Sequence, residues 1–367
     1  MQNQLARTDS PHRNLPTAYT PRVAVVLNGN ARSVNERIIR DVQALLGADE
    51  ALFVSQSLDQ AQFIARQIVN RRFDVVLCGG GDGTLTRVVS DVLALRPHRV
   101  PAFGVLRLGT GNAVAAALGV ARASQSGIAR ELTQARDSDA RTTLPLLNIE
   151  GKLAPFAGVG LDSLILEDYN RLKDNLDRVP FGNLLKGHAG YGLSIATRSM
   201  WRYLRETRPE VVIRNVGAPA LPVDLAGCPT GPAIGTGQII YRGPVTVAAA
   251  STVPFYGFGM RMFPQACLDP ERFQLRIADL SLGQMLAKLP QVLSGELEHE
   301  RLWDFSCTAI AVELDKPAPL QIGGDLAGTR QSFRIGIRDV PCVTGSNGVV
   351  AAPAPREVPM ASGRLAA

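Results

Sequence analysis

Residues 75–84 read VVLCGGGDGT, and this stretch decides how the first third of the chain is interpreted. A short apolar run of strand character is followed by four glycines in five positions, with Asp82 among them and Thr84 after them. Apolar residues then recur at helical spacing from Leu85. Backbone without Cβ atoms lets a ligand approach closely, and a helix N-terminus favours phosphate. The pattern predicts a buried strand, a loop that holds a polyphosphate, and a helix beginning there, with Asp82 placed to meet a metal or a hydroxyl.

Two commoner phosphate-binding loops do not fit this stretch. The Rossmann fingerprint requires glycine at its sixth position, which is Thr84 when counting starts at Gly79. The Walker loop requires Gly-Lys followed by Ser or Thr, and the candidate Gly151-Lys152 is followed by Leu153. A plain glycine-rich turn is the competing interpretation, but Asp and Thr inside the loop exceed what a turn needs.

The composition describes an ordinary globular protein with room for two domains in 367 residues. No apolar run approaches the roughly 18 residues that span a bilayer, and the first 20 residues lack the apolar region of a signal peptide. The five cysteines are scattered and the four histidines lie far apart, which favours a reduced cytoplasmic protein without zinc. The net charge of +6 suits an anionic lipid surface better than nucleic acid, because Lys and Arg form no concentrated tract.

The first part of the chain is predicted to be an α/β unit with a parallel sheet. Apolar strands alternate with helical patterns, at 23–27, 51–54, 75–78 and 102–106 for the strands. The unusual polar residues directly follow these strands, where ligands bind in such sheets: Asn28, Ser55, Asp82, Thr84, Thr110 and Asn112.

The character changes near residue 143, where short β-like runs punctuated by Pro and Gly become dominant. These runs predict an antiparallel β-sandwich domain after a partly helical stretch at 164–204. We therefore expect a flexible arm (1–20), an α/β nucleotide-binding domain (21–143), a β-rich domain (144–342) and a disordered tail (343–367).

Five motifs in this order resemble the catalytic domain of diacylglycerol, sphingosine and ceramide kinases, including the bacterial soluble lipid kinases. The resemblance runs from about Arg22 to Ile337. The first glycine loop alone also fits NAD kinases, but the ordered set is more specific. The motifs are 79–84 (GGGDGT), 109–112 (GTGN), 158–162 (GVGLD), 256–260 (YGFGM, with Pro264 and Ala266) and 321–325 (QIGGD).

The resemblance implies an active site between the two domains, where ATP, Mg²⁺ and a lipid substrate meet. It makes the β-rich domain the lipid-substrate domain and implies Asp325 as general base, supported by Asp162. The chemistry of phosphoryl transfer makes Asp82 suited to hold Mg²⁺, directly or through water. The resemblance leaves Asp269 as a candidate for a structural metal site. The implied ATP-binding residues are Asn28, Ser55, Gly79, Gly80, Gly81, Asp82, Gly83, Thr84, Thr86, Gly109, Thr110 and Asn112.

Several positions depart from the family pattern. Asn28 is followed by Gly29 rather than Pro, Asn112 by Ala113 rather than Asp, and Pro270 stands where the family has a metal-binding aspartate. Gly323 replaces the first aspartate of Asp-Gly-Glu, and Asp325 is one methylene shorter than the family's glutamate. Whether Asp325 or Asp162 is the base stays open.

Three functions remain under consideration. The first is a lipid kinase acting on diacylglycerol or ceramide, peripherally bound to membranes through the basic segment 171–205. The second is an NAD-kinase-like phosphotransferase with a soluble substrate, disfavoured by the apolar residues at 255–263. The third is a lipid- or nucleotide-binding relative that has lost catalysis. No nucleic-acid partner is expected, and a homodimer stays open.

Overall fold

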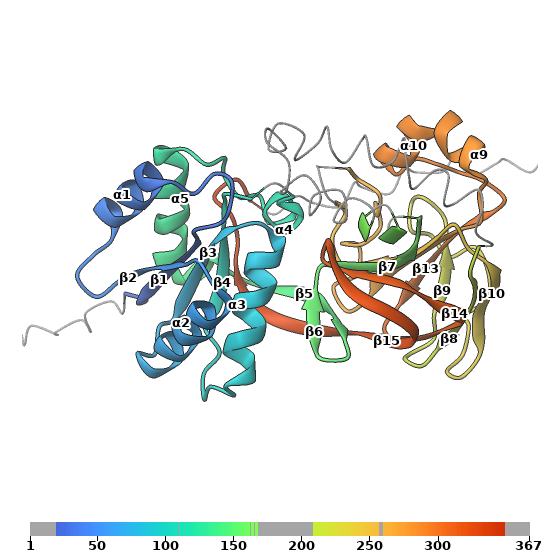
Figure 1. The fold of residues 1–367 in the computed structure, drawn as a ribbon, viewed down its shortest axis with the longest axis horizontal. Helices are drawn as coiled ribbons and strands as arrows, with labels where there is room; N and C mark the ends of the chain where they lie inside the picture. The colour runs from blue at the N-terminus through green and yellow to red at the C-terminus, as the bar shows by residue number, and fades with distance from the viewer. Residues whose placement is uncertain are drawn as a thin grey trace, which may run out of the picture.

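The computed structural model describes residues 20–109, 111–161, 163–164, 166–167, 208–256 and 260–348. Residues 1–19 of the predicted arm at 1–20, most of the helical stretch at 164–204 and the end of the tail lie outside these residues. Figure 1 shows a helix-rich N-terminal part beside a C-terminal part built of strands.

The N-terminal part is a parallel sheet covered on both faces, as the sequence predicts. Its strands are ordered β2-β1-β3-β4, and every neighbouring pair is parallel. Its elements are β1 (Val23–Asn28), α1 (Glu36–Leu45), β2 (Ala51–Ser55), α2 (Leu58–Asn70), β3 (Val75–Gly80), α3 (Asp82–Ala94), β4 (Ala102–Arg107), α4 (Ala113–Ala117) and α5 (Gln125–Arg136).

Strand alternation explains the two covered faces. Val76 and Cys78 of β3 pack in the cluster that contains residues of α2 and α3, whereas Val75 and Leu77 pack with residues of α1 and α5. Successive side chains of a strand point to opposite faces, so the side chains of the fully buried β3 pack against the helices on both faces of the sheet. This places α2 and α3 on one face and α1 and α5 on the other (Figure 1).

The C-terminal part consists mainly of antiparallel strands around its own apolar cluster. Its elements are η1 (Ser138–Ala140), β5 (Arg141–Ile149), β6 (Lys152–Ala154), β7 (Phe156–Gly160), β8 (Glu210–Asn215), β9 (Leu221–Val223), β10 (Ile239–Pro244), β11 (Val247–Ser251), β12 (Phe273–Ala278), α9 (Leu282–Ala287), α10 (Leu289–Ser294), β13 (Leu302–Cys307), β14 (Ile310–Ile322) and β15 (Asp325–Val343). The predicted fold class, a parallel α/β part followed by an antiparallel part, is confirmed.

The two parts share one hydrogen-bonded sheet, which the sequence did not predict. The long strand β15 pairs with β14 near its start and with β5 along its second half. Its end reaches β4 in parallel register at Cys342 and Phe103. A single strand therefore runs from the C-terminal part into the N-terminal sheet.

The predicted disordered tail begins too early. Val343 ends β15, Thr344 donates its N–H to Ala140, and Gly345 donates to Leu118. The Ser346 hydroxyl donates to Glu131 at 2.7 Å. Residues 343–348 thus pack on the N-terminal part because their backbone groups find partners there, and the remainder, 349–367, lies outside the described residues.

No helix among the residues that the structure describes is long and apolar enough to cross a membrane.

Candidate active site

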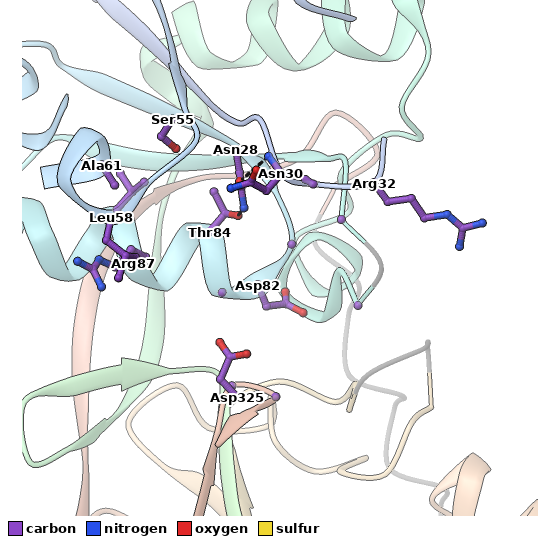
Figure 2. Close-up of a pocket in the computed structure, with 18 of the residues that line it drawn as sticks. Asn28, Asn30, Arg32, Ser55, Leu58, Ala61, Asp82, Thr84, Arg87 and Asp325 are labelled. Carbon is purple, nitrogen blue, oxygen red and sulfur yellow. Dashed lines mark hydrogen bonds between the residues drawn. The ribbon is translucent and has the colours of Figure 1, made fainter. Parts of the chain in front are cut away.

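A cavity of about 880 Å³ lies between the two parts of the molecule. One wall carries polar groups from the carboxyl ends of β1 and β2, Asn28 and Ser55, and from the first turn of α3, Thr84. The facing wall comes from the C-terminal part and carries Asp325 together with Phe156 and other apolar residues. Figure 2 shows Asp325 pointing across the cavity toward Asp82 and the start of α3.

Helix α3 begins at the cavity without a side-chain cap. Helices α1, α2 and α5 each have a capping side chain, from Asn35, Ser57 and Ser124 respectively. The N-cap of α3 is instead Gly81, which has no side chain to offer. A helix N-terminus presents backbone N–H groups and a partial positive charge. The uncapped start of α3 therefore leaves its first turn available to an anion in the cavity.

Asn28 holds the polar wall together. Its Nδ2 donates to Thr84 Oγ1 at 3.2 Å, and its Oδ1 accepts the N–H of Asn30 at 3.0 Å. Ser55 lies beside it because Asn28 and Ser55 are partners in the parallel register of β1 and β2. The end of β1 is thus linked to the first turn of α3.

Two of the first loop's glycines have no room for a Cβ beside neighbouring side chains, whereas Gly81 and Gly83 have such room. A Cβ on Gly79 would lie 2.3 Å from Leu27 Cδ2, and one on Gly80 would lie 2.3 Å from Thr84 Oγ1. A Cβ on Gly109 in the second loop would lie 2.2 Å from Gly81 Cα. The two loops therefore contact each other through backbone atoms, which only glycine permits.

Asp82 links the two loops. Its carboxylate accepts the N–H of Ala113 at 2.8 Å and the N–H of Val114 at 2.9 Å, so it caps α4 from outside that helix. The carboxylate is only 8% exposed. Burial raises the pKa of Asp82, and the hydrogen bonds from Ala113 and Val114 oppose this rise. The sequence predicted a ligand contact at Asp82 but not its capping role.

Asp325 follows a tight hairpin turn. Ile322 and Asp325 are paired residues of β14 and β15, so Gly323 and Gly324 form a two-residue connection. Their φ angles are +62° and +87°, a combination typical of the type I′ turn. The turn is thus a defined two-residue hairpin. Asp325 Oδ2 lies 3.5 Å from the position of a Cβ built on Gly83, so its carboxylate faces the first turn of α3.

The cavity brings together eight of the predicted site residues: Asn28, Ser55, Gly81, Asp82, Gly83, Thr84, Gly109 and Asp325. Four of the predicted ATP-binding residues do not line it. Gly79 and Gly80 belong to buried β3, the Thr86 hydroxyl donates to the Gly83 carbonyl, and Asn112 bonds to Gly109. These four residues support the loops from behind. Thr110 and Asp162 lie outside the described residues, so their roles remain predictions.

The metal assignments remain predictions as well. Asp269 forms an ion pair with Arg272 at 3.4 Å and lines a different, smaller cavity from Asp82. Within the described ranges, no group of three or more His, Cys, Asp or Glu side chains is arranged to hold a metal ion. Mg²⁺ in phosphoryl-transfer sites typically uses one or two carboxylates plus substrate phosphates, and Asp82 is a carboxylate of the first loop that lines the large cavity.

Sequence reasoning missed several residues that line the cavity. Arg32 and Arg87 line it, the latter paired with Asp91 at 2.7 Å, and Gln56 and Leu58 line it beside Ser55. Their position in the sequence could have identified them, because each lies within four residues of a predicted site residue. The apolar wall of Phe156, Leu166, Tyr256 and Met260 was not predictable as a unit, because its members come from distant segments.

Comparison with known proteins supports the resemblance inferred from the motifs. Residues 22–143 match the family model described as the diacylglycerol kinase catalytic domain. A protein named "Probable lipid kinase YegS" from Salmonella arizonae is 32% identical over 133 residues, and the same-named protein from Salmonella newport is 32% identical over the same length. Each match covers 33% of this chain and 44% of the relative, so the chain spans less than half of the length of these relatives.

Solved structures extend the similarity to both parts of the fold. A diacylglycerol kinase from Bacillus anthracis str. Sterne superposes with a TM-score of 0.59 at 14% identity, covering 92% of this chain and 100% of that one. A second B. anthracis chain gives a TM-score of 0.63 at 14% identity, covering 90% and 99%. At this identity the likeness establishes the fold alone.

Proposed function

We propose that the protein is an ATP-dependent lipid kinase that transfers the γ-phosphate to a hydroxyl of a two-chain lipid of the diacylglycerol or ceramide class. The observation that carries the proposal is the composition of one cavity. An uncapped helix start and a carboxylate from the opposite wall face each other across it. The match of residues 22–143 to the diacylglycerol kinase catalytic domain supports the same reaction class.

The cavity has two chemically different walls. The polar wall offers Asn28, Ser55 and the first turn of α3, together with Arg87, to a nucleotide triphosphate. The opposite wall offers the rings of Phe156 and Tyr256 and the side chain of Met260. An acceptor with an apolar body and a hydroxyl fits this second wall better than a dinucleotide does.

Phosphoryl transfer depends mainly on positioning and charge neutralisation. In this proposal the first turn of α3 holds phosphate oxygens, and Asp325 removes the proton of the acceptor hydroxyl. Mg²⁺ bound with ATP neutralises the phosphate charge, and Asp82 is the residue suited to hold it directly or through water. The hydrogen bonds from Ala113 and Val114 to Asp82 keep the second loop next to the first during this step.

The test is an assay of purified protein with labelled ATP and a panel of diacylglycerol, ceramide, sphingosine and NAD. Transfer to diacylglycerol or ceramide, dependent on Mg²⁺, is the expected result. Phosphorylation of NAD and of no lipid would identify the protein as an NAD-kinase-like phosphotransferase with a soluble substrate. Nucleotide binding without transfer to any acceptor would identify a non-catalytic relative.

We further propose that the protein contacts anionic membranes peripherally, because the proposed acceptor resides in a bilayer. The predicted contact segment, 171–205, lies outside the described residues. Its support is its composition, which alternates arginine and lysine with leucine and tryptophan. Co-sedimentation with liposomes should rise with anionic lipid and fall with salt, whereas no sedimentation with any lipid would contradict the proposal.

A further inference from the structure

A buried glutamine precedes the turn that carries Asp325 and also lines the cavity. Gln321 is 1% exposed and belongs to β14, next to Leu320 and Ile322. A buried amide without partners costs free energy, so a glutamine at this position needs both of its polar atoms bonded. The structure supplies both partners, and both belong to the cavity region.

The two hydrogen bonds of Gln321 join the turn to the apolar wall. Its Oε1 accepts the N–H of Gly324 at 3.0 Å, and its Nε2 donates to the Tyr256 hydroxyl at 2.7 Å. The orientation of the amide follows from these partners, because a backbone N–H can only donate. Gln321 therefore bridges the residue before Asp325 to a residue that lines the cavity.

Tyr256 is itself held in place by aromatic packing. Its ring centroid lies 4.6 Å from that of Phe156 and 5.7 Å from that of Phe263. Its backbone N–H donates to the Met260 carbonyl at 2.7 Å. A second anchor holds the turn, where the Gly323 N–H donates to the Phe156 carbonyl at 2.8 Å. The apolar wall and the turn are thus joined at Phe156 and Tyr256.

We propose that Gln321 and Tyr256 are positioning residues that fix the Asp325 carboxylate relative to a lipid acceptor seated on the apolar wall. The inference rests on the proposed function, in which Asp325 is the base. Aspartate is a short side chain, so its reach is determined by the backbone of the turn, and the turn is restrained by Gln321. An acceptor packed against Tyr256 would therefore meet a base whose position is set by the same tyrosine.

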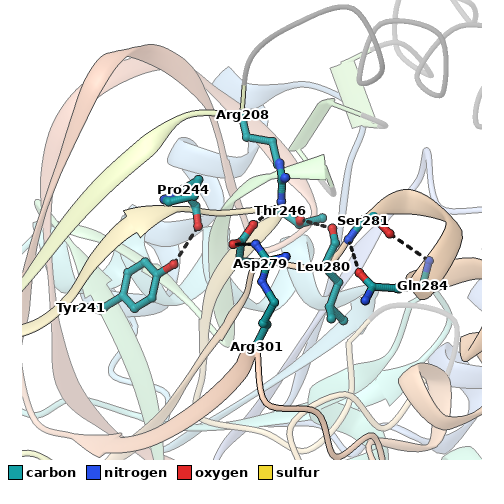
Figure 3. Close-up of polar contacts among 9 residues, drawn as sticks. All are labelled: Arg208, Tyr241, Pro244, Thr246, Asp279, Leu280, Ser281, Gln284 and Arg301. Atoms are coloured by element: carbon teal, nitrogen blue, oxygen red, sulfur yellow. Dashed lines mark hydrogen bonds and ion pairs between the residues drawn. The ribbon is translucent and has the colours of Figure 1, made fainter.

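The test compares Tyr256→Phe with Tyr241→Phe as a matched control. Tyr241 also packs against a ring, that of Trp303, with the ring centroids 5.1 Å apart. Its hydroxyl donates to the Pro244 carbonyl at 2.7 Å, and Figure 3 shows this hydrogen bond as a dashed line. Tyr241 does not line the cavity. Each substitution removes a hydroxyl that takes part in a hydrogen bond and keeps the ring. Gln321→Met is a second variant that removes both bonds of the amide at similar volume.

Tyr256→Phe is expected to lower kcat about 3–10-fold with little change in the KM for ATP, because it removes the hydroxyl to which Gln321 Nε2 donates. Tyr241→Phe should leave kcat unchanged. The effect should vanish when Tyr256→Phe is combined with Asp325→Asn, because the tyrosine acts through the aspartate. A kcat equal to that of the control, or a loss that persists beside Asp325→Asn, would overturn the inference.

Hydrogen–deuterium exchange provides a readout that does not depend on activity. The peptide covering 320–328 should exchange faster in Tyr256→Phe than in the wild type and in Tyr241→Phe. Unchanged exchange would overturn the restraint itself. If the exchange difference is present but the wild type phosphorylates no lipid, the proposed function is wrong. The catalytic role of the restraint is then excluded as well.

Discussion

Gly81 and Gly109 contact each other so closely that a Cβ on Gly109 would lie 2.2 Å from the Gly81 Cα and 2.3 Å from its nitrogen. These residues belong to the two glycine loops, which follow neighbouring strands β3 and β4. Their contact makes the two loops one surface at the cavity, rather than two independent ligand-binding turns.

Gly109→Ala is therefore expected to separate the loops. Backbone atoms cannot yield as a flexible side chain can, so we expect a loss of stability of about 1–3 kcal/mol and at least tenfold weaker ATP binding. Thermal unfolding and nucleotide titration measure both effects. Gly283→Ala is the control, because its Cβ would meet nothing within 4 Å. Equal behaviour of the two variants would refute the packing argument.

Asp82→Asn tests the link between the first loop and α4. The N–H groups of Ala113 and Val114 bond to different oxygens of Asp82, and in asparagine one of these oxygens is replaced by an NH2 group that cannot accept. It also holds Mg²⁺ and triphosphate less well. We expect a folded protein that has lost most of its kinase activity. Asp41→Asn on α1, which removes an acid from an ion pair with Arg37, should retain activity, and near-normal turnover of Asp82→Asn would exclude the proposed role of this loop.

The pH dependence of stability should report the ion pair of Glu50 and Arg136. Burial raises the pKa of Glu50, but hydrogen bonds from Arg136, at 2.6 and 2.8 Å, and from the Gly47 N–H outweigh it, so the net pKa lies below its ordinary value of 4.5. A carboxyl with a lowered pKa adds stability above its unfolded pKa and loses it as the pH falls through the folded value.

At pH 6–7 the free energy of unfolding of Glu50→Gln should therefore be about 1–3 kcal/mol lower than that of the wild type. The gap should shrink as the pH falls below 4.5. Glu36→Gln is the control, since its pair with Arg40 is long and its side chain is 92% exposed. A gap between wild type and Glu50→Gln that is constant from pH 3 to 7 would contradict the assignment.

Local patterns were sufficient to predict the N-terminal sheet. The strand 75–78 and the helix after Thr84 have clear periods and boundaries, and polar residues such as Asn28 mark the carboxyl ends of strands. These features depend on neighbours in sequence, so the sequence determines them directly.

Long-range contacts could not be predicted in the same way. The pairing of Cys342 with Phe103 joins residues more than 200 positions apart, and no local pattern indicates it. The same holds for the bond between Gln321 and Tyr256 and for the capping of α4 by Asp82. Glycine in the first loop was attributed to ligand approach, whereas Leu27 and Thr84 already require it at Gly79 and Gly80.

Asp325→Asn tests the proposed general base. The carboxylate faces the first turn of α3 across the cavity, and a base must come within about 3 Å of the acceptor hydroxyl, directly or through one water. We expect kcat to fall roughly 10²–10⁴-fold, with little change in the KM for ATP. Asp325→Glu, which introduces the glutamate found at this position in the lipid kinases that the motifs resemble, should retain part of the activity, because the turn that precedes it is unchanged.

The rival base is Asp162, and the two assignments predict opposite results. If Asp325 is the base and Asp162 supports it, Asp162→Asn should reduce kcat less than Asp325→Asn does, and the double variant should be no worse than Asp325→Asn alone. Rates measured on the lipid that the acceptor panel identifies decide between them. Wild-type kcat in Asp325→Asn together with an inactive Asp162→Asn would reverse the two roles, and the hairpin of Gly323 and Gly324 would then position a residue that contacts the acceptor without taking its proton.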